Sequence, residues 1–211
     1  MTGSLGLGEG TTGAVARGRR PSTSREDVAR AALDLFARQG FDETTVDEIA
    51  AAVGVSRRTF FRYFDSKRDV VWGEFDDELV RLRALLAEAP ADRPMMDVLR
   101  WAVVTTNRFG AGELEELRTR IRLIGTVPSL IAHSAVMHDH WRAVVASFVA
   151  GRVGGSPDDL YPQTVAHAAL GASVAAFNHW AAGSPEELTV EVDRALRLLA
   201  TGFDEGSPGV L

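Results

Sequence analysis

The sequence predicts an all-α protein of about nine helices, with a small N-terminal three-helix head and a larger helical body. Apolar residues recur at helical spacing from Ser24 to Phe203, and the strict alternation typical of β-strands is scarce. Glycine and proline separate these helical stretches at short intervals. We therefore expect a disordered basic arm over residues 1–22, a head over 23–70 and a body over 71–211.

The composition narrows the class of protein. Hydrophobic residues make up 45% and charged residues 25% of the chain, as in ordinary globular proteins. Because there is no cysteine, disulfides, thiolate metal sites and a cysteine nucleophile are excluded. No apolar run approaches the roughly 18 residues of a membrane span, and the first residues hold no cleavable signal. We expect a cytoplasmic protein with no membrane contact and no cofactor.

The net charge of −6 is unevenly distributed. Residues 1–70 carry 11 Lys/Arg against 10 Asp/Glu, whereas residues 71–211 carry 12 against 19. The acidity therefore belongs to the body, and local clusters of basic residues matter more for nucleic-acid binding than the total charge. The second such cluster consists of Arg57, Arg58, Arg62, Lys67 and Arg68.

The first two helices of the head begin at capping residues. Ser24 precedes the first helix, with Asp27 three residues later, and Gly40 is placed to end it. Thr45 precedes the second helix, and Glu48 completes a capping box. Both helices carry an apolar stripe on one face, so they are expected to pack together.

The third helix is short and begins after Ser56. Phe60 and Phe64 lie one turn apart and are expected to face the core. Arg58 and Arg62 also lie one turn apart, on another face. This helix therefore buries aromatic groups and presents basic groups to solvent.

A fourth and longer helix is predicted from Ser66 as far as Pro90. The body then adds five helices. Their expected spans are 95–109, 113–124, 128–152, 159–182 and 185–203. The last of these spans has a strong helix-start signal. Ser184 can cap the helix, Pro185 suits its first position, and Glu187 suits its third position.

Residues 45–65 have the features that a helix-turn-helix requires. Ala50 is small where the two helices cross, and Gly54 tolerates positive φ in the turn. The second helix of such a motif presents polar groups from its first turns, because that end enters the major groove of DNA. The pattern favours DNA binding over a plain helical hairpin.

From Ser24 to Val71 the chain closely resembles the TetR family of transcriptional repressors, through TTVDEIAAAVGVSRRTFFRYFDSKRDVV. The resemblance implies a DNA-binding head, a ligand-enclosing body and a homodimer formed by the last two helices. By position it implies phosphate contacts at Thr44 or Thr45, Phe61, Tyr63 and Lys67. It implies base-edge contacts at Arg57, Arg58, Thr59 and Arg62, with Ser56 at the start of that helix. Phe61 departs from the tyrosine common in the family, so a hydroxyl contact to phosphate is lost.

A narrower resemblance comes from RRTFFRYF, VVWGEFDDEL and RIRLIGTVPSLIAHSAVMHDHWRAVVASFVAGRVG. These stretches are similar to regulators of the mycofactocin redox-cofactor system, which respond to long-chain acyl-coenzyme A. The resemblance implies that a small apolar effector, such as an acyl-CoA, releases a repressor from an inverted-repeat operator in double-stranded DNA.

Large side chains on the body helices are candidates for the effector site, although each would also suit an ordinary core. They are Trp72, Phe75, Trp101, Phe109, Met137, Trp141, Phe177 and Trp180, with Asn178 as an orienting group. Arg118 and Arg122 share a helix face and could hold an anionic group or form salt bridges with nearby glutamates. The histidines lack the spacing of a helical zinc site, so we expect no metal.

The dimer is expected to form through small and apolar residues of the last two helices. They are Val165, Ala169, Ala172, Ala176, Val192, Ala195, Leu196 and Leu199. Two other functions stay open: a small helical enzyme tethered to DNA, and an architectural DNA-binding protein without a ligand. Because no catalytic motif is found, we expect no enzyme.

Overall fold

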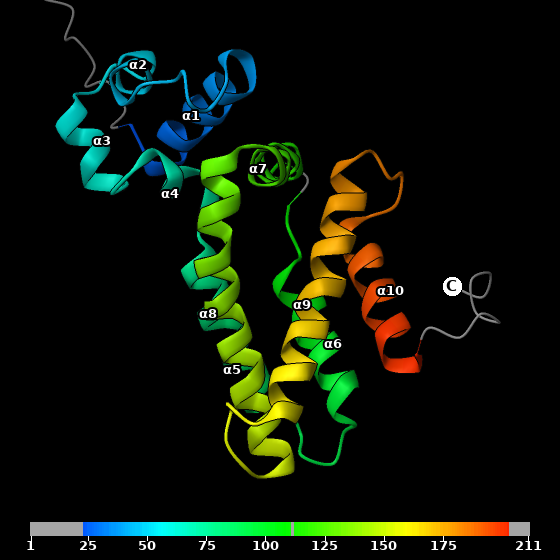
Figure 1. The fold of residues 1–211 in the computed structure, drawn as a ribbon. Helices are drawn as coiled ribbons and strands as arrows, with labels where there is room; N and C mark the ends of the chain where they lie inside the picture. The colour runs from blue at the N-terminus through cyan, green and yellow to red at the C-terminus, as the bar shows by residue number, and fades with distance from the viewer. Residues whose placement is uncertain (1–22, 111, 203–211) are drawn as a thin grey trace, which may run out of the picture.

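The computed structural model describes residues 23–110 and 112–202, so the predicted basic arm lies outside the described residues (Figure 1). The predicted all-α class is confirmed. The helices are α1 (Arg25–Gln39), α2 (Val46–Ala52), α3 (Arg57–Tyr63), α4 (Lys67–Trp72), α5 (Phe75–Glu88), α6 (Met95–Thr106), α7 (Leu114–Thr126), α8 (Pro128–Val153), α9 (Leu160–Ala181) and α10 (Leu188–Thr201). The described residues thus form ten helices where about nine were expected.

The tenth helix arises because the predicted fourth helix is broken at Gly73. This residue has φ 63° and ψ −120°, a conformation that side chains with a Cβ rarely adopt. The chain therefore leaves α4 and begins α5 in a new direction. The expectation of one continuous helix from the head into the body was wrong.

The helix starts of the head are confirmed. Ser24, Thr45 and Ser56 each accept a hydrogen bond from a backbone N–H in the first turn, and Ser24 and Thr45 form full capping boxes. Ser66 forms a third box with Asp69, which the sequence analysis had not identified. Because these bonds satisfy free backbone donors, they fix where each short helix begins.

The start of the last helix differs from the prediction. α10 begins at Leu188, after Glu187, and not at Pro185. Ser184 donates to the Glu191 carboxylate, which also accepts from His179 Nδ1 at 2.9 Å. These hydrogen bonds lower the pKa of the buried Glu191 carboxyl. Ser184 therefore contacts a side chain instead of capping the helix.

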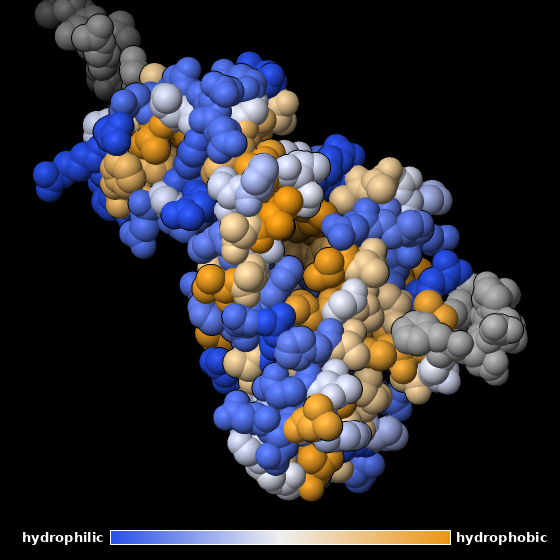
Figure 2. Space-filling model, viewed as in Figure 1, coloured by the Kyte–Doolittle hydropathy of each residue, from blue (hydrophilic) through white to orange (hydrophobic). Residues whose placement is uncertain are grey.

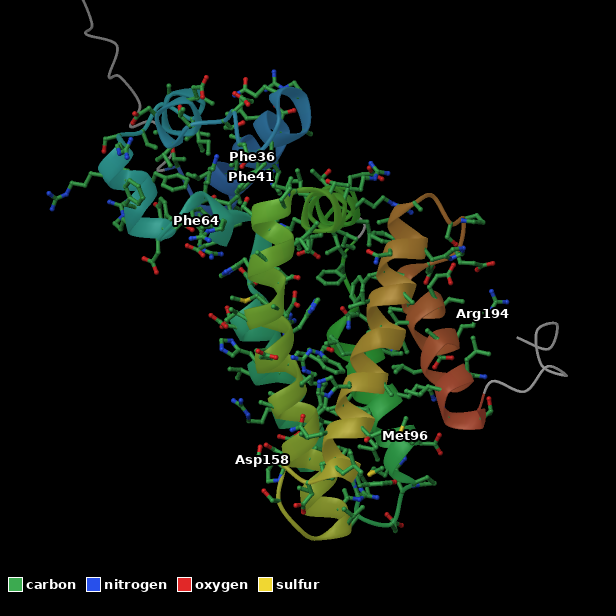
Figure 3. The ribbon with its side chains drawn as sticks, viewed as in Figure 1. Phe36, Phe41, Phe64, Met96, Asp158 and Arg194 are labelled. Atoms are coloured by element: carbon green, nitrogen blue, oxygen red, sulfur yellow. The ribbon has the colours of Figure 1, made fainter. Side chains whose placement is uncertain are left out.

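The molecule has two apolar cores. The head core gathers α1 to α4 around Phe36, Phe41 and Phe64, which lie together in the head (Figure 3). It also contains Leu130 from the first turn of α8, which is 0% exposed. The second core joins α5, α6, α8, α9 and α10, and α7 lies across the end of the body nearest the head (Figure 1).

Candidate functional site

The outer face of α3 is basic. Arg57, Arg58, Phe61 and Arg62 are exposed there, whereas Phe60 is buried in the head core. Figure 2 shows hydrophilic residues around a smaller hydrophobic area on this side of the head. The division follows from the helical spacing, since Phe60 and the basic residues lie on different faces.

Two of the three arginines have partners within the head. Arg57 Nη1 lies 3.0 Å from Asp47 Oδ2, and Arg62 Nη2 donates to Tyr63 Oη at 3.1 Å. Arg58 makes no ion pair or hydrogen bond with any residue that the structure describes. It is therefore the arginine of α3 that can contact DNA without first giving up an internal bond.

Two residues implied as phosphate contacts are engaged inside the head. Thr44 is 1% exposed, and its hydroxyl donates to the Gly40 carbonyl at 2.7 Å. Lys67 Nζ donates to the carbonyls of Phe41 at 2.6 Å, Asp42 at 3.2 Å and Thr44 at 3.1 Å. Burial thus removes Thr44 from the surface, and Lys67 holds the turn between α1 and α2.

The remaining polar groups that the resemblance places on the DNA surface make hydrogen bonds within the head. The hydroxyls of Thr45 and Ser56 cap α2 and α3, and Thr59 lies beside Ser56 with 3.0 Å between their hydroxyl oxygens. Tyr63 Oη donates to the Thr23 carbonyl at 2.9 Å. These bonds order the edge of α3.

The body contains a cavity of about 380 Å³ lined by residues of α4 to α9. Figure 2 shows apolar groups in a hollow on the visible face below α7. Six of the predicted ligand residues line the cavity: Trp72, Phe75, Phe109, Trp141, Phe177 and Asn178. The volume falls within the range of small-molecule sites.

Five predicted ligand residues do not line this cavity: Trp101, Met137, Arg118, Arg122 and Trp180. Trp101 is 37% exposed on α6, and Trp180 is 1% exposed within the body core. Helical spacing identified large side chains but could not tell which of them face the same interior space.

Arg118 and Arg122 instead bind the end of α9. Arg118 Nη1 donates to the Trp180 carbonyl at 2.6 Å, and its guanidinium lies 4.0 Å from the centre of the Trp180 ring. Arg122 Nε donates to the Ala181 carbonyl at 3.1 Å. Cations are stabilised at a helix C-terminus, so both arginines fasten α9 to α7. A weaker contact joins Arg118 Nε to Glu115 at 3.8 Å, as one of the predicted salt bridges.

Polar residues that the sequence analysis had not selected also line the cavity. Glu78, Arg120 and His138 face it from α5, α7 and α8. Burial raises the pKa of the Glu78 carboxyl to about 7, against the attraction of Arg81 and Arg120. Burial likewise lowers the pKa of the His138 imidazole, with help from Arg142. Arg120 could have been found from its position, because it lies on the opposite face of α7 from Arg118.

A second hollow of about 320 Å³ adjoins the cavity between α7 and α9. Ile121, Gly125 and Asn178 line both spaces, whereas Arg122, Thr126, Ala181 and Ala182 line only the second hollow. The cavity therefore has a neighbouring recess at the C-terminal end of α9.

A chain of ion pairs links the head to the cavity wall. Glu116 on α7 lies 3.1 Å from Arg30 Nε on α1 and 3.7 Å from Arg120 Nη2. On the same side, Arg25 Nη2 of α1 donates to the Gly73 carbonyl at 3.3 Å. Helix α1 is thus held both by α7 and by the break between α4 and α5.

The predicted dimer residues divide into two groups. Ala169, Ala176, Val192 and Leu196 are buried in the core of their own chain, so they cannot meet a second copy. The other four, Val165, Ala172, Ala195 and Leu199, are partly buried. Exposed groups on the same helices include Leu160, Tyr161 and Val190.

None of the helices in the described ranges has the length and apolar character needed to cross a bilayer. No group of three or more acidic or histidine side chains within the described ranges could hold a metal ion.

Two family models match the chain. Residues 28–71 match the model for bacterial regulatory proteins of the tetR family, and residues 93–204 match the model for the MftR C-terminal domain. The resemblance predicted from the head and body motifs is confirmed.

Individual proteins agree with these matches. MftR of Mycobacterium tuberculosis, whose name designates a mycofactocin biosynthesis transcriptional regulator, is 40% identical over 187 residues, 89% of this chain and 94% of that protein. TcmR of Streptomyces glaucescens, named an HTH-type transcriptional regulator, is 33% identical over 150 residues, 68% of this chain and 66% of that protein. A crystal structure of Thermus thermophilus FadR, a TetR family repressor in complex with lauroyl-CoA, superposes with a TM-score of 0.53. That match is 26% identical and covers 88% of this chain and 100% of the FadR chain.

Proposed function

The chain belongs to the TetR family of bacterial regulatory proteins, with a C-terminal domain of the MftR type, and from this premise we propose that it is an effector-released repressor. It is a DNA-binding transcriptional regulator. In the proposal, the repressor occupies an inverted-repeat operator until an amphipathic effector fills the cavity of the body. The observation that carries this proposal is the chain of ion pairs from the cavity wall at Arg120 through Glu116 to Arg30 of the head.

The proposed reading element is α3. Its exposed arginines suit the acceptor edges of guanine in the major groove, where one good bidentate contact is worth about 1–3 kcal/mol of discrimination. Arg58 is the first candidate because it is exposed and has no partner among the described residues. Arg62 is the second, and its bond to Tyr63 Oη would have to rearrange.

A two-fold dimer is part of the proposal. One head reads only a few base pairs, so two heads related by symmetry are needed for a specific site. Helices α9 and α10 pack against each other along one side of the body and leave an outer face (Figure 1). Leu160 and Tyr161 are exposed at the start of α9, and Gly171 and Ala175 continue along that helix, where small side chains allow close approach. We expect the second copy to cover this face.

The proposed effector carries a hydrocarbon chain. The lauroyl-CoA bound by FadR supports this class, because the cavity here is walled by apolar groups such as Phe75, Trp141 and Phe177. Each buried methylene contributes about 0.8 kcal/mol. A coenzyme portion would leave through the adjoining hollow, which the exposed residue Arg122 lines.

The test of the DNA function is selection from a pool of random DNA duplexes with the purified full chain. We expect an inverted repeat to be enriched, and promoters of mycofactocin genes are the first natural candidates because of the MftR relative. Arg58→Ala should lose the preference, whereas Arg83→Ala, an equal change of charge at an exposed position of α5, should keep it. Enrichment of no common sequence by the unmodified protein would contradict the proposal.

The test of release is a gel shift with the selected operator and lauroyl-CoA. We expect the complex to dissociate over the same range of lauroyl-CoA concentrations in which calorimetry detects binding. If lauroyl-CoA left the operator affinity unchanged, the result would favour an architectural protein over a regulated repressor.

A further inference from the structure

The face of α5 that lines the body cavity carries one carboxyl among apolar groups. Phe75, Leu79 and Leu82 line the cavity from this helix, and Glu78 shares their face at helical spacing. Burying a carboxyl beside hydrocarbon side chains costs free energy unless a hydrogen-bond partner is supplied. A partner for Glu78 is therefore expected, either from the fold or from a molecule in the cavity.

The described part of the fold does not supply this partner. None of the described residues makes a hydrogen bond or an ion pair with the Glu78 carboxyl. Arg81 and Arg120 attract its negative charge without forming an ion pair with it. The residue is only partly buried, and neither carboxyl oxygen is among the enclosed atoms without a partner, in contrast to nitrogens of Trp72 and Arg120. A molecule in the cavity can therefore reach the Glu78 carboxyl.

Several other polar groups of the lining already bond to the backbone. Thr106 Oγ1 and Asn107 Nδ2 both donate to the Val103 carbonyl, at 2.9 Å and 2.8 Å. Ser173 Oγ donates to the Ala169 carbonyl at 2.8 Å. A hydrocarbon chain can lie against these groups at little cost, but it would leave the Glu78 carboxyl without a partner.

The titratable groups around Glu78 belong to three elements. Glu74 and Arg81 act on it from its own segment, and Arg120 acts from α7. His138 lines the cavity from α8, and burial lowers the pKa of its imidazole. The described lining residues of α4, α6 and α9 include no titratable side chain. Because burial raises the pKa of the Glu78 carboxyl to about 7, its ionised and protonated forms are both present near neutral pH.

We propose that Glu78 is the recognition site for a hydroxyl group on the hydrocarbon chain of the effector. A hydroxyl donates to an ionised carboxylate and accepts from a protonated carboxyl, so it suits both forms. A charged group at this point would be buried among apolar side chains at a higher cost in free energy. This inference rests on the proposed effector function and deepens it by naming a polar group that the chain carries.

The test compares two isomeric probes, 1-decanol and methyl nonyl ether. The alcohol can donate and accept a hydrogen bond, whereas the ether can only accept. Calorimetric titration of each probe with the full-length protein measures the two affinities. At pH 8 the carboxyl is mostly ionised, and we expect the alcohol to bind about tenfold more tightly than the ether. At pH 5 the protonated carboxyl donates to either probe, so this preference should fall below about threefold.

Variants of Glu78 assign the site. Glu78→Leu should remove the preference for the alcohol at both pH values, and Glu78→Gln should show the same preference at both. Glu88→Gln is the matched control, because Glu88 lies on the same helix outside the cavity lining and should behave as the unmodified protein. A preference for the alcohol at pH 8 that Glu78→Leu retains would overturn the hydroxyl site.

A titration with lauroyl-CoA separates this inference from the proposed function. If lauroyl-CoA binds but the alcohol is not preferred over the ether at pH 8, the hydroxyl site is overturned and the effector function stands. If lauroyl-CoA and both probes fail to bind, both are overturned.

Discussion

At the scale of single residues, Gly73 has a conformational role that its surroundings alone do not reveal. A Cβ at this position would meet the Arg120 guanidinium at 3.4 Å, which is ordinary van der Waals contact. Space is therefore not the constraint. The constraint is the backbone, because φ 63° with ψ −120° is sparsely populated by residues other than glycine.

We expect Gly73→Ala to lower the free energy of unfolding by about 1–3 kcal/mol, since the strained backbone is retained at that cost. Denaturant unfolding followed by circular dichroism measures it. Gly151→Ala is the control, because Gly151 lies within α8 with open space around its Cβ position and should gain roughly 0.5–1 kcal/mol. If Gly73→Ala were as stable as the unmodified protein, the break would not depend on glycine.

Glu78 makes stability depend on pH. Its carboxyl has a pKa of about 7 in the folded protein, above the ordinary value of 4.5, so the folded state holds the proton more tightly than the unfolded state. The stabilising effect is complete below pH 4.5 and is lost as the pH rises through 7. The shift corresponds to at most about 3 kcal/mol.

We expect Glu78→Gln to melt at the same temperature as the unmodified protein at pH 5 and at a higher temperature at pH 8. Calorimetric melting across this range tests it. Glu88→Gln, an exposed change on the same helix, should show no such divergence. Parallel melting curves of Glu78→Gln and the unmodified protein would mean that Glu78 ionises freely in the fold.

At the scale of helices, the junction of α7 and α8 belongs to the head core, although both helices also contribute residues to the body core. Leu130 is fully buried in the head core, and Leu123, Ile124 and Val127 pack against the same core. A boundary at residue 70 remains a prediction, and it leaves out Leu130, a residue of the head core that lies 60 positions later in the chain. Sequence patterns show which residues share a helix face, but not which core that face joins.

We expect Leu130→Ala to destabilise the head by about 2–5 kcal/mol, through lost burial and the cavity that is left. Hydrogen exchange in α1 to α4 should rise with it. Val136→Ala, at an exposed position on α8, should change stability by no more than about 0.5 kcal/mol. Unchanged exchange in the head would show that α8 does not support it.

The helices of the head could be predicted because their start signals are local. Ser24, Thr45 and Ser56 satisfy backbone donors within three residues, so no distant contact is needed. Ser184 carried a similar signal, but its hydroxyl donates to the Glu191 carboxylate and does not cap the last helix. Local capping signals thus fail where a buried charged group competes for the same hydroxyl.

In the candidate sites too, local features could be predicted from the sequence, whereas tertiary contacts could not. The exposed arginines of α3 follow from helical spacing, whereas the engagement of Lys67 by three carbonyls depends on the turn at residues 41–44. In the body, aromatic content indicated a cavity, but Trp101 and Trp72 could not be told apart before the helices were packed. Arg120 was missed because attention went to the face of α7 that carries Arg118 and Arg122, and only the packing of the helices shows that the opposite face lines the cavity.

At the scale of the whole molecule, Glu116 connects two sites. One of its oxygens pairs with Arg30 of the head and the other with Arg120 of the cavity wall. Because Arg30 is largely exposed, the first pair is worth no more than about 1 kcal/mol. This single contact can therefore change the coupling between ligand and DNA by about fivefold at most.

We expect Glu116→Gln to reduce the ligand-induced loss of operator affinity by up to about fivefold, with little change in operator binding without ligand. Gel shifts with and without lauroyl-CoA measure the ratio. Glu115→Gln is the neighbouring control, because the Glu115 side chain is exposed and pairs only weakly with Arg118 at 3.8 Å. If both variants had the same ratio of operator affinities without and with lauroyl-CoA as the unmodified protein, the coupling would not depend on Glu116.

The position of Glu116 between Arg30 and Arg120 also has a reciprocal consequence. If the effector lowers the affinity for DNA, then DNA lowers the affinity for the effector by the same factor. Protein free in solution would accordingly fill with effector before protein on the operator. Excess repressor would act as a sink for the effector, so the concentration that switches the promoter would rise with the amount of repressor in the cell.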